Sequence, residues 1–217
     1  NSMNGNQFRN YLFMQGTRGT AFWELYYSDS IFDEEKYLIN ADFLEWAEAN
    51  FSKLRNAKMI GKTPSSTATL TGNPSGEAGT QEAYGFSCFD GDEGIISMRN
   101  PAAVEKTITF ILDDAIGATV DGNYYKTIEH AYSVEGKLGT SRDMYKKGEE
   151  ISVTLQPGET QIWNLSKTKD TIAPTLTKVF AKDDKTLQVS ASEHLMADNI
   201  EFEVKVNGKV VNTKVEK

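Results

Sequence analysis

Residues 84–101 decide the fold, and they read YGFSCFDGDEGIISMRNP. Apolar side chains recur at every second position on both sides of an acidic, glycine-bounded centre, and a period of two is typical of β-strands. The centre, residues 90–94, supplies side chains that tolerate a positive φ, which a tight reversal requires. Because Pro101 has no backbone N–H to donate, the second strand should end there. The stretch predicts a β-hairpin that separates a helical approach from an all-β remainder.

Short alternating segments continue after this hairpin. Ile108, Phe110 and Leu112 share one face of a predicted strand, and residues 151–155 and 160–165 show the same alternation around a Gln-Pro-Gly-Glu turn. Runs of short strands with turn signals and no helical period indicate an antiparallel sandwich. We therefore predict an antiparallel β-sandwich over residues 82–166.

The last part of the chain predicts a second β module. Residues 167–174 are interpreted as a linker, and Asn207-Gly208 is a strong signal for a type I′ hairpin turn. An immunoglobulin-like sandwich takes about seven strands and roughly 100 residues. Residues 175–217 are too few for that, so we expect a partial, truncated Ig-like module.

The residues before the hairpin predict a strand followed by one long helix. Residues 19–27, GTAFWELYY, are nearly all apolar, which is typical of a strand buried on both faces. From Ser30 the period becomes three to four, and Ser30 with Asp33 forms a capping-box pattern. Gly61 and Pro64 should end the helix. Its apolar stripe consists of Leu38, Ala41, Leu44, Ala47, Phe51 and Leu54, and Phe43 and Trp46 widen it.

One strand and one helix form a single βα unit, which cannot close a sheet without further partners. We therefore interpret residues 1–61 as a βα segment from the end of a barrel, and the Ser-, Thr-, Gly- and Pro-rich residues 62–81 as a linker. The predicted fold class is mainly β with one long helix: a barrel-end remnant, an antiparallel sandwich and a truncated Ig-like module.

Composition excludes several classes of function. The 217 residues are 39% hydrophobic and 25% charged, as in soluble globular proteins. A net charge of −8 without clustered Lys and Arg argues against nucleic-acid binding. No apolar run approaches the roughly 20 residues of a membrane span. The polar start is no secretory signal, although a signal could have been removed or the chain could begin within a larger protein.

Few residues suggest chemistry. Asp90, Asp92 and Glu93 bunch carboxylates but lack calcium-loop spacing, which favours a solvated hairpin tip. His130 and His194 have no neighbouring ligands for a zinc site. The single cysteine, Cys88, excludes an internal disulfide and is expected in the core. Four tyrosines could form either a platform for stacking on sugars or part of the core, the second being favoured: Tyr124, Tyr125, Tyr132 and Tyr145.

The order of parts resembles the C-terminal region of a retaining glycoside hydrolase of the α-galactosidase or endo-α-N-acetylgalactosaminidase type. Those enzymes continue from a (β/α)8 barrel into an antiparallel sandwich. The match covers about residues 8–166 and rests on residues 19–28 as a late barrel strand, 40–46 as the next helix, and 84–86, 94–101 and 155–163 in the sandwich. Residues 170–175 and 192–195 resemble the opening strands of bacterial Ig-like modules on surface and secreted proteins.

This resemblance implies a non-catalytic region of a secreted, periplasmic or cell-surface bacterial protein, without a cofactor. The family's two catalytic carboxylates lie on mid-barrel strands that the match does not include, so no residue here is assigned to either role. Because barrel active sites lie at the C-terminal ends of strands, Trp23, Glu24 and Asp29 are the candidate substrate contacts. A structural salt bridge, or exposure at the end of a truncated barrel, is the favoured alternative for these residues. The expected partners are the upstream barrel and, through the parent enzyme, a carbohydrate.

The alternative is a stand-alone carbohydrate-binding or cell-surface adhesion module. The two hypotheses predict different surfaces. An apolar surface over Phe22, Trp23, Phe43 and Trp46 that the chain itself leaves uncovered would favour a region of a larger enzyme. A self-contained fold with a shallow aromatic groove would favour the binding module.

Overall fold

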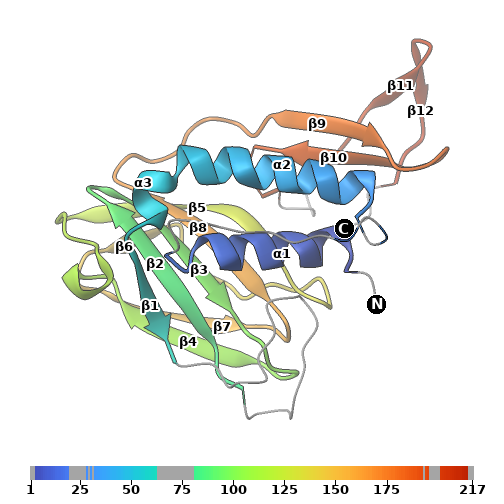
Figure 1. Cartoon of the computed structure of the whole chain (residues 1–217). Coiled ribbons are helices and arrows are strands. Elements are labelled where there is room, and N and C mark those ends of the chain that lie inside the picture. The colour runs from blue at the N-terminus through green and yellow to red at the C-terminus, as the bar shows by residue number, and fades with distance from the viewer. Residues whose placement is uncertain are drawn as a thin grey trace. The chain divides into compact units, whose positions relative to one another are not determined.

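The computed structural model describes residues 3–19, 28, 30, 32–62, 81–192, 194–195 and 201–214. The chain forms two compact units, Asn1–Thr171 and Ile172–Lys217. Its secondary structure is mainly antiparallel β, as predicted (Figure 1). Among the described residues, no helix combines the length and the apolar character that crossing a bilayer takes. Whether the first segment derives from a barrel stays a prediction.

Two longer helices open the chain. α1 (Gly5–Gly16) begins with a capping box in which Asn4 accepts from the Gln7 backbone N–H at 2.8 Å. α2 (Glu34–Ala49) begins at Asp33, whose carboxylate accepts from the Lys36 backbone N–H at 3.0 Å. The N-cap is therefore Asp33 and not Ser30, because only the later residue reaches the free N–H groups of the first turn. A single turn, α3 (Phe51–Leu54), follows α2.

The helical segment ends earlier than predicted. Gly61, expected to end the helix, instead closes a strand, β1 (Ala57–Gly61), with a φ of 75°. β1 pairs antiparallel with β2 (Tyr84–Asp90), so its backbone groups are satisfied by a sheet neighbour. The Asn56 side-chain amide, directly before β1, donates to the Phe89 carbonyl of β2 at 2.9 Å and so holds the start of β1 against β2.

The predicted hairpin is confirmed. β2 returns through Gly91, at a φ of 62°, into β3 (Glu93–Arg99), and the two strands pair in register from Tyr84 opposite Arg99. They lie inside a curled six-stranded sheet of order β1-β2-β3-β8-β5-β6. The other strands of this sheet are β8 (Thr160–Ser166), β5 (Asn123–Tyr132) and β6 (Met144–Lys146).

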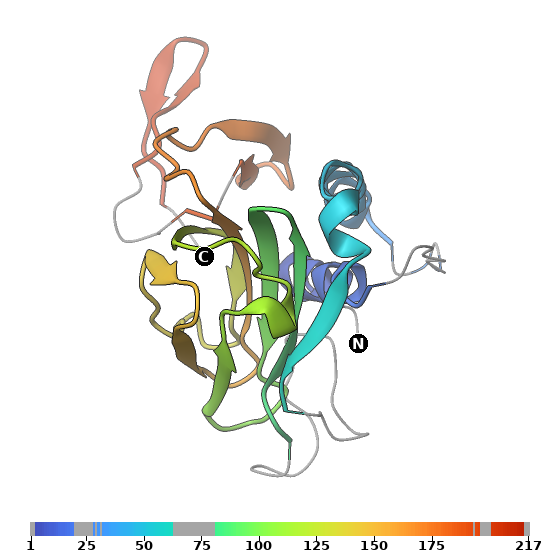
Figure 2. The same ribbon diagram turned by 90° about the vertical axis from the view of Figure 1, so that its left-hand side faces the viewer.

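A second sheet and the helices cover opposite faces of the six-stranded sheet. β4 (Lys106–Ile111) pairs with β7 (Glu150–Leu155), and a short 3-10 helix, η1 (Asp114–Ile116), follows β4. Figures 1 and 2 show α1 and α2 on one side of the large sheet and β4 with β7 on the other. One apolar core, around Trp163, fills the space between the sheets, and a second, around Phe43, lies under the helices.

The face that α2 turns toward the sheet differs from the predicted stripe. Ile39, Phe43 and Ala47 are buried, whereas Leu44 and Phe51 are 46% and 40% exposed. The helix carries apolar residues on two faces, and α1 with the sheet beneath it covers only the face that presents Phe43. The predicted stripe is therefore correct for Ala47 and Leu54 and wrong for Ala41, Leu44 and Phe51, which are exposed.

The second unit consists of two hairpins. β9 (Leu176–Ala181) pairs with β10 (Leu187–Ala191), and β11 (Val204–Val206) pairs with β12 (Lys209–Val211). Asn207 and Gly208 have φ values of 52° and 78°, which confirms the predicted type I′ turn. None of the described residues from 172 to 214 is buried. The Ig-like character of this unit stays a prediction.

Candidate functional site

The three predicted substrate contacts, Trp23, Glu24 and Asp29, lie outside the described residues, and so does most of the predicted strand 19–27. The structure therefore leaves these predictions untested.

The acidic centre of the hairpin forms a turn at the tip of β2 and β3, as predicted. The Glu93 carboxylate forms an ion pair with Lys53, at 3.1 Å between Nζ and Oε2. Within the described part of the chain, His, Cys, Asp and Glu side chains nowhere gather in the groups of three or more that could hold a metal ion.

Cys88 is a fully buried core residue, as predicted. Its thiol lies 3.4 Å from the Thr17 carbonyl oxygen, to which it donates. Burial raises the pKa of the thiol to about 12, so Cys88 is a neutral thiol at physiological pH. A thiol of this kind is a poor nucleophile.

A β-bulge in β5 turns two polar side chains toward the helices. The register with β8 shifts between Ile128 and His130, which leaves Glu129 as the extra residue. Ile128 packs against the core between the sheets, while Glu129 accepts from the Trp46 indole N–H at 2.6 Å. His130 hydrogen-bonds from Nε2 to Asn10 Oδ1 and stacks on Phe13 at 5.2 Å between ring centroids. Together these contacts join β5 to both long helices.

The environment of Glu129 shifts its ionisation. Burial raises the pKa of its carboxyl, and this effect is opposed by the hydrogen bond from Trp46 and by the charge of Lys53. A raised pKa can mark a proton-transfer group. Here the carboxylate is engaged by a side chain of the fold itself, so the contacts describe a packing role.

A fully buried carboxylate, that of Glu159, holds the segment that leads into β6. Both of its oxygens lie 2.9 Å from the Gly139 backbone N–H, and Oε2 accepts from the Gln156 N–H at 2.6 Å. The Gln161 amide donates to the Glu159 carboxylate and also, at 2.9 Å, to the Gly139 carbonyl. Trp163 then donates from its indole N–H to Gln161 at 2.7 Å. This network fixes residue 139 against the end of β7.

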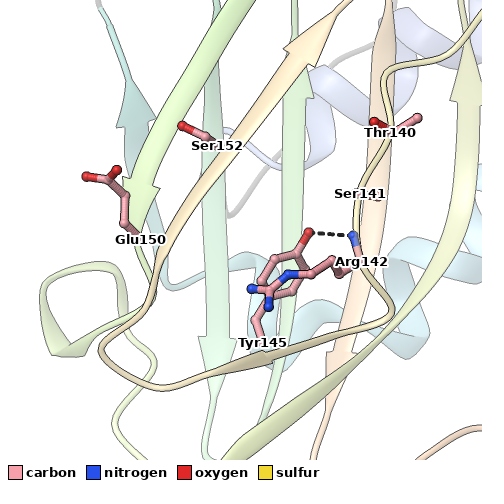
Figure 3. Close-up of a pocket in the computed structure, with 6 residues that line it drawn as sticks. All are labelled: Thr140, Ser141, Arg142, Tyr145, Glu150 and Ser152. Carbon is pink, nitrogen blue, oxygen red and sulfur yellow. Dashed lines mark hydrogen bonds between the residues drawn. The ribbon is translucent and has the colours of Figure 1, made fainter.

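The segment held by Glu159 forms one wall of a groove of about 470 Å³, which we call the β6–β7 groove. Outward-facing residues of β7 form the opposite wall (Figure 3). The groove is lined by Thr140, Ser141, Arg142, Tyr145, Glu150 and Ser152. β7 lies on the side of the six-stranded sheet away from α1 and α2 (Figure 1).

Aromatic and cationic groups stack beneath this groove. The Tyr145 ring stacks on Trp163 at 5.8 Å between centroids, and the Arg142 guanidinium lies over Tyr145 at 4.8 Å (Figure 3). Burial raises the pKa of the Tyr145 phenol, which stays neutral and accepts from the Arg142 backbone N–H at 2.9 Å. Arg142 also forms an ion pair with Glu149, and Lys126 donates to Ser141.

Two of the four tyrosines take the core role that the sequence analysis favoured. Tyr124 and Tyr145 are buried and belong to the core between the sheets, which confirms the favoured interpretation for these two. Tyr125 and Tyr132 are half-buried. Neither face of Tyr145 is open for stacking on a sugar, because Trp163 and Arg142 lie against the ring.

Sequence reasoning did not find the groove. The alternation of β7 places Glu150, Ser152 and Thr154 on the outer face, and this signal was present. The neighbouring segment around Arg142 has neither motif nor periodicity. Its position depends on contacts between Gly139, Glu159 and Gln161, which no local pattern predicts.

No protein-family model matches the sequence, and no curated protein matches it. Among solved structures, the chain is similar to a protein from Bacillus halodurans assigned as an α-N-acetylgalactosaminidase, with a TM-score of 0.35, 13% identity and coverage of 65% of this chain and 27% of that one. An α-amylase from Anoxybacillus gives a TM-score of 0.34 and 13% identity, over 66% of this chain and 25% of that one.

A third similar structure is a GH27 β-L-arabinopyranosidase from Geobacillus stearothermophilus in complex with arabinose. It gives a TM-score of 0.34 and 10% identity, over 64% of this chain and 25% of that one. The chain spans about a quarter of each of these glycoside hydrolases. Likeness at this level assigns neither an activity nor a family to the chain.

Proposed function

We propose that this chain is the non-catalytic C-terminal region of a secreted, glycoside hydrolase-like bacterial protein, in which the helix-covered sandwich packs on and stabilises the catalytic barrel. The observation that carries the proposal is an apolar face of the helical layer that the described part of the chain leaves open. The residue pattern of the sandwich, which resembles that family, supplies the identity of the partner.

The open face, which we call the outer α2 face, is formed by Tyr37, Leu44 and Phe51, which are 54%, 46% and 40% exposed. Residues seven apart lie two helical turns apart on the same side of a helix. Tyr37 and Leu44 therefore share one side of α2, and Phe51, the first residue of α3 after the helix ends at Asn50, adds a third exposed apolar side chain. Fully burying one such side chain contributes about 1.5–3 kcal/mol, so a partner covering all three would gain substantially.

The surface expected to be open was a different one. Phe43 is 3% exposed, and Trp46 packs on Phe13 at 4.7 Å between ring centroids. Both are therefore sheltered within this chain, because α1 and β5 lie against them. Phe22 and Trp23 lie outside the described residues. The proposal rests on the outer α2 face and not on the surface predicted from the sequence.

The roles of the buried carboxylates favour a non-catalytic region. Glu129 is bound by Trp46, and Glu159 is bound by backbone N–H groups and Gln161. A retaining hydrolase needs two carboxyl groups about 5–5.5 Å apart around a substrate. In the proposed protein those two groups come from the barrel. Trp23, Glu24 and Asp29 belong to this proposal as residues near the mouth of that barrel.

The test is binding between the 217-residue chain and the protein segment encoded directly upstream, measured by isothermal titration calorimetry. Leu44→Lys places a charge on the outer α2 face and should weaken binding at least about tenfold, or 1.4 kcal/mol. Glu45→Lys adds the same side chain at the next, exposed position and serves as the matched control. An upstream region without a barrel-sized domain, or binding that Leu44→Lys leaves unchanged, would contradict the proposal.

The second candidate function is a stand-alone carbohydrate-binding or adhesion module. The β6–β7 groove favours it, because the groove lies on the sandwich and requires no residue of a barrel. A chain that binds a saccharide but no upstream segment would support this candidate over the first.

A further inference from the structure

We propose that the β6–β7 groove binds the terminal residue of a neutral saccharide, with Arg142 as hydrogen-bond donor and Glu150 as acceptor. This inference deepens the second candidate function by naming its site and ligand class. It does not require the outer α2 face to contact a barrel.

The chemistry of the lining matches a polyol. Each sugar hydroxyl both donates and accepts, and neighbouring hydroxyls present these groups in pairs. A guanidinium offers five N–H donors in one plane, and a carboxylate offers two oxygens that only accept. Thr140, Ser141 and Ser152 add hydroxyl groups that can serve in either direction. The volume of about 470 Å³ lies within the range of small-molecule sites, about 300–1,000 Å³.

The walls of the groove are held in place before any ligand arrives. On one wall, Gly139 is bonded to Glu159 and Gln161, and a Cβ at position 139 would lie 2.2 Å from the Thr154 carbonyl oxygen. On the other wall, Ser152 bonds across the sheet to Thr109 at 2.7 Å. Fixed walls lower the entropic cost of binding, because few groups must be ordered by the ligand.

Charge selects a neutral ligand over an anion. Arg142 brings one positive charge to the groove and Lys126, which donates to Ser141, brings a second, but Glu149 is already paired with Arg142 and Glu150 lines the opposite wall. The chain as a whole carries a net charge of −8. A sulfate or a uronate would meet as many carboxylates as cations at the groove, whereas a neutral sugar can use both kinds of group.

Hydrogen bonds must supply the affinity, because Tyr145 presents no open ring face. The expected dissociation constant is therefore of the order of 1 mM, far weaker than a site with an aromatic platform. Glu150→Gln and Arg142→Met each remove one charged partner and should weaken binding at least about tenfold, since hydrogen bonds to charged groups are the stronger ones.

The experiment titrates the 15N-labelled full chain with methyl α-D-galactopyranoside and methyl α-D-glucopyranoside, followed by amide chemical shifts. The proposal predicts saturable shifts in residues 139–152 that both variants weaken. Met59→Ala, 47% exposed on β1 at the opposite edge of the six-stranded sheet from β6, is the control and should leave the dissociation constant unchanged. Sodium glucuronate and sodium sulfate form the anion arm and should bind more weakly.

Three results would overturn the inference: no saturable shifts at about 100 mM sugar, shifts that both variants leave unchanged, or tighter binding of the anions. The Leu44→Lys chain should bind the sugars as the unaltered chain does. Failure of the chain to bind sugars would therefore not contradict the packing proposal. Weaker binding of the upstream segment by the Leu44→Lys chain would likewise not contradict the proposed sugar site.

Discussion

Replacing Glu159 with alanine removes the hydrogen-bond acceptor that holds one wall of the β6–β7 groove in place. Glu159 is fully buried, and three groups donate to it: the backbone N–H groups of Gly139 and Gln156 and the Gln161 side-chain amide. Each donor left without a partner costs about 1–3 kcal/mol, and neighbouring losses are not additive. We expect the free energy of unfolding to fall by about 3–5 kcal/mol. That is a large fraction of the roughly 5–15 kcal/mol typical of a domain.

The assay is equilibrium unfolding in urea followed by tryptophan fluorescence, since Trp163 is linked to Glu159 through Gln161. The matched control is Glu149→Ala, which removes an ion pair with Arg142 near the surface and should cost less than about 1 kcal/mol. A loss below about 1 kcal/mol for Glu159→Ala would refute the reasoning, because the network would then carry no more than a surface pair.

Three further predictions concern the helical side and the core. Trp46→Phe removes the indole donor to Glu129 and should lower the free energy of unfolding by about 2–3 kcal/mol, measured by urea titration, whereas an unchanged midpoint would count against this bond. Burial raises the folded-state pKa of Glu129, so its contribution is fully present below the unfolded pKa and is lost as pH rises through the folded pKa. The unaltered chain should therefore gain stability relative to Glu129→Gln on acidification from pH 8 toward the unfolded value of 4.5, and a relative loss would contradict this sign. The Cys88 thiol, with a pKa of about 12, should react with a thiol reagent only after denaturation, and rapid labelling of the folded chain would show that it is accessible.

Strands and turns were predictable because their signals are local. The glycine-bounded acidic centre fixed the hairpin, and the Asn207-Gly208 pair fixed a second one, since few residues adopt a positive φ at low cost. The alternation around Ile151 and Val153 correctly identified the inward face of β7.

The predictions failed where the local sequence was compatible with two different structures. α2 is apolar on two faces, and periodicity placed Phe43 and Leu44 in one wide stripe, although only Phe43 is buried. Residues 57–61 are a strand only because β2 offers an antiparallel neighbour. The bulge at Glu129 and the Gly139–Glu159 contact likewise join residues distant in the sequence, so neither candidate site could be assembled from the sequence.

Hydroxyl-radical footprinting tests the central claim most directly. Oxidation of Tyr37, Leu44 and Phe51 would be quantified by mass spectrometry in the 217-residue chain and in the longer protein that includes the upstream segment. The proposed packing predicts strong protection of these three side chains in the longer protein, with Met144, 40% exposed on β6, oxidised equally in both. Equal oxidation of the outer α2 face in the two proteins would contradict the claim that this face packs on a barrel.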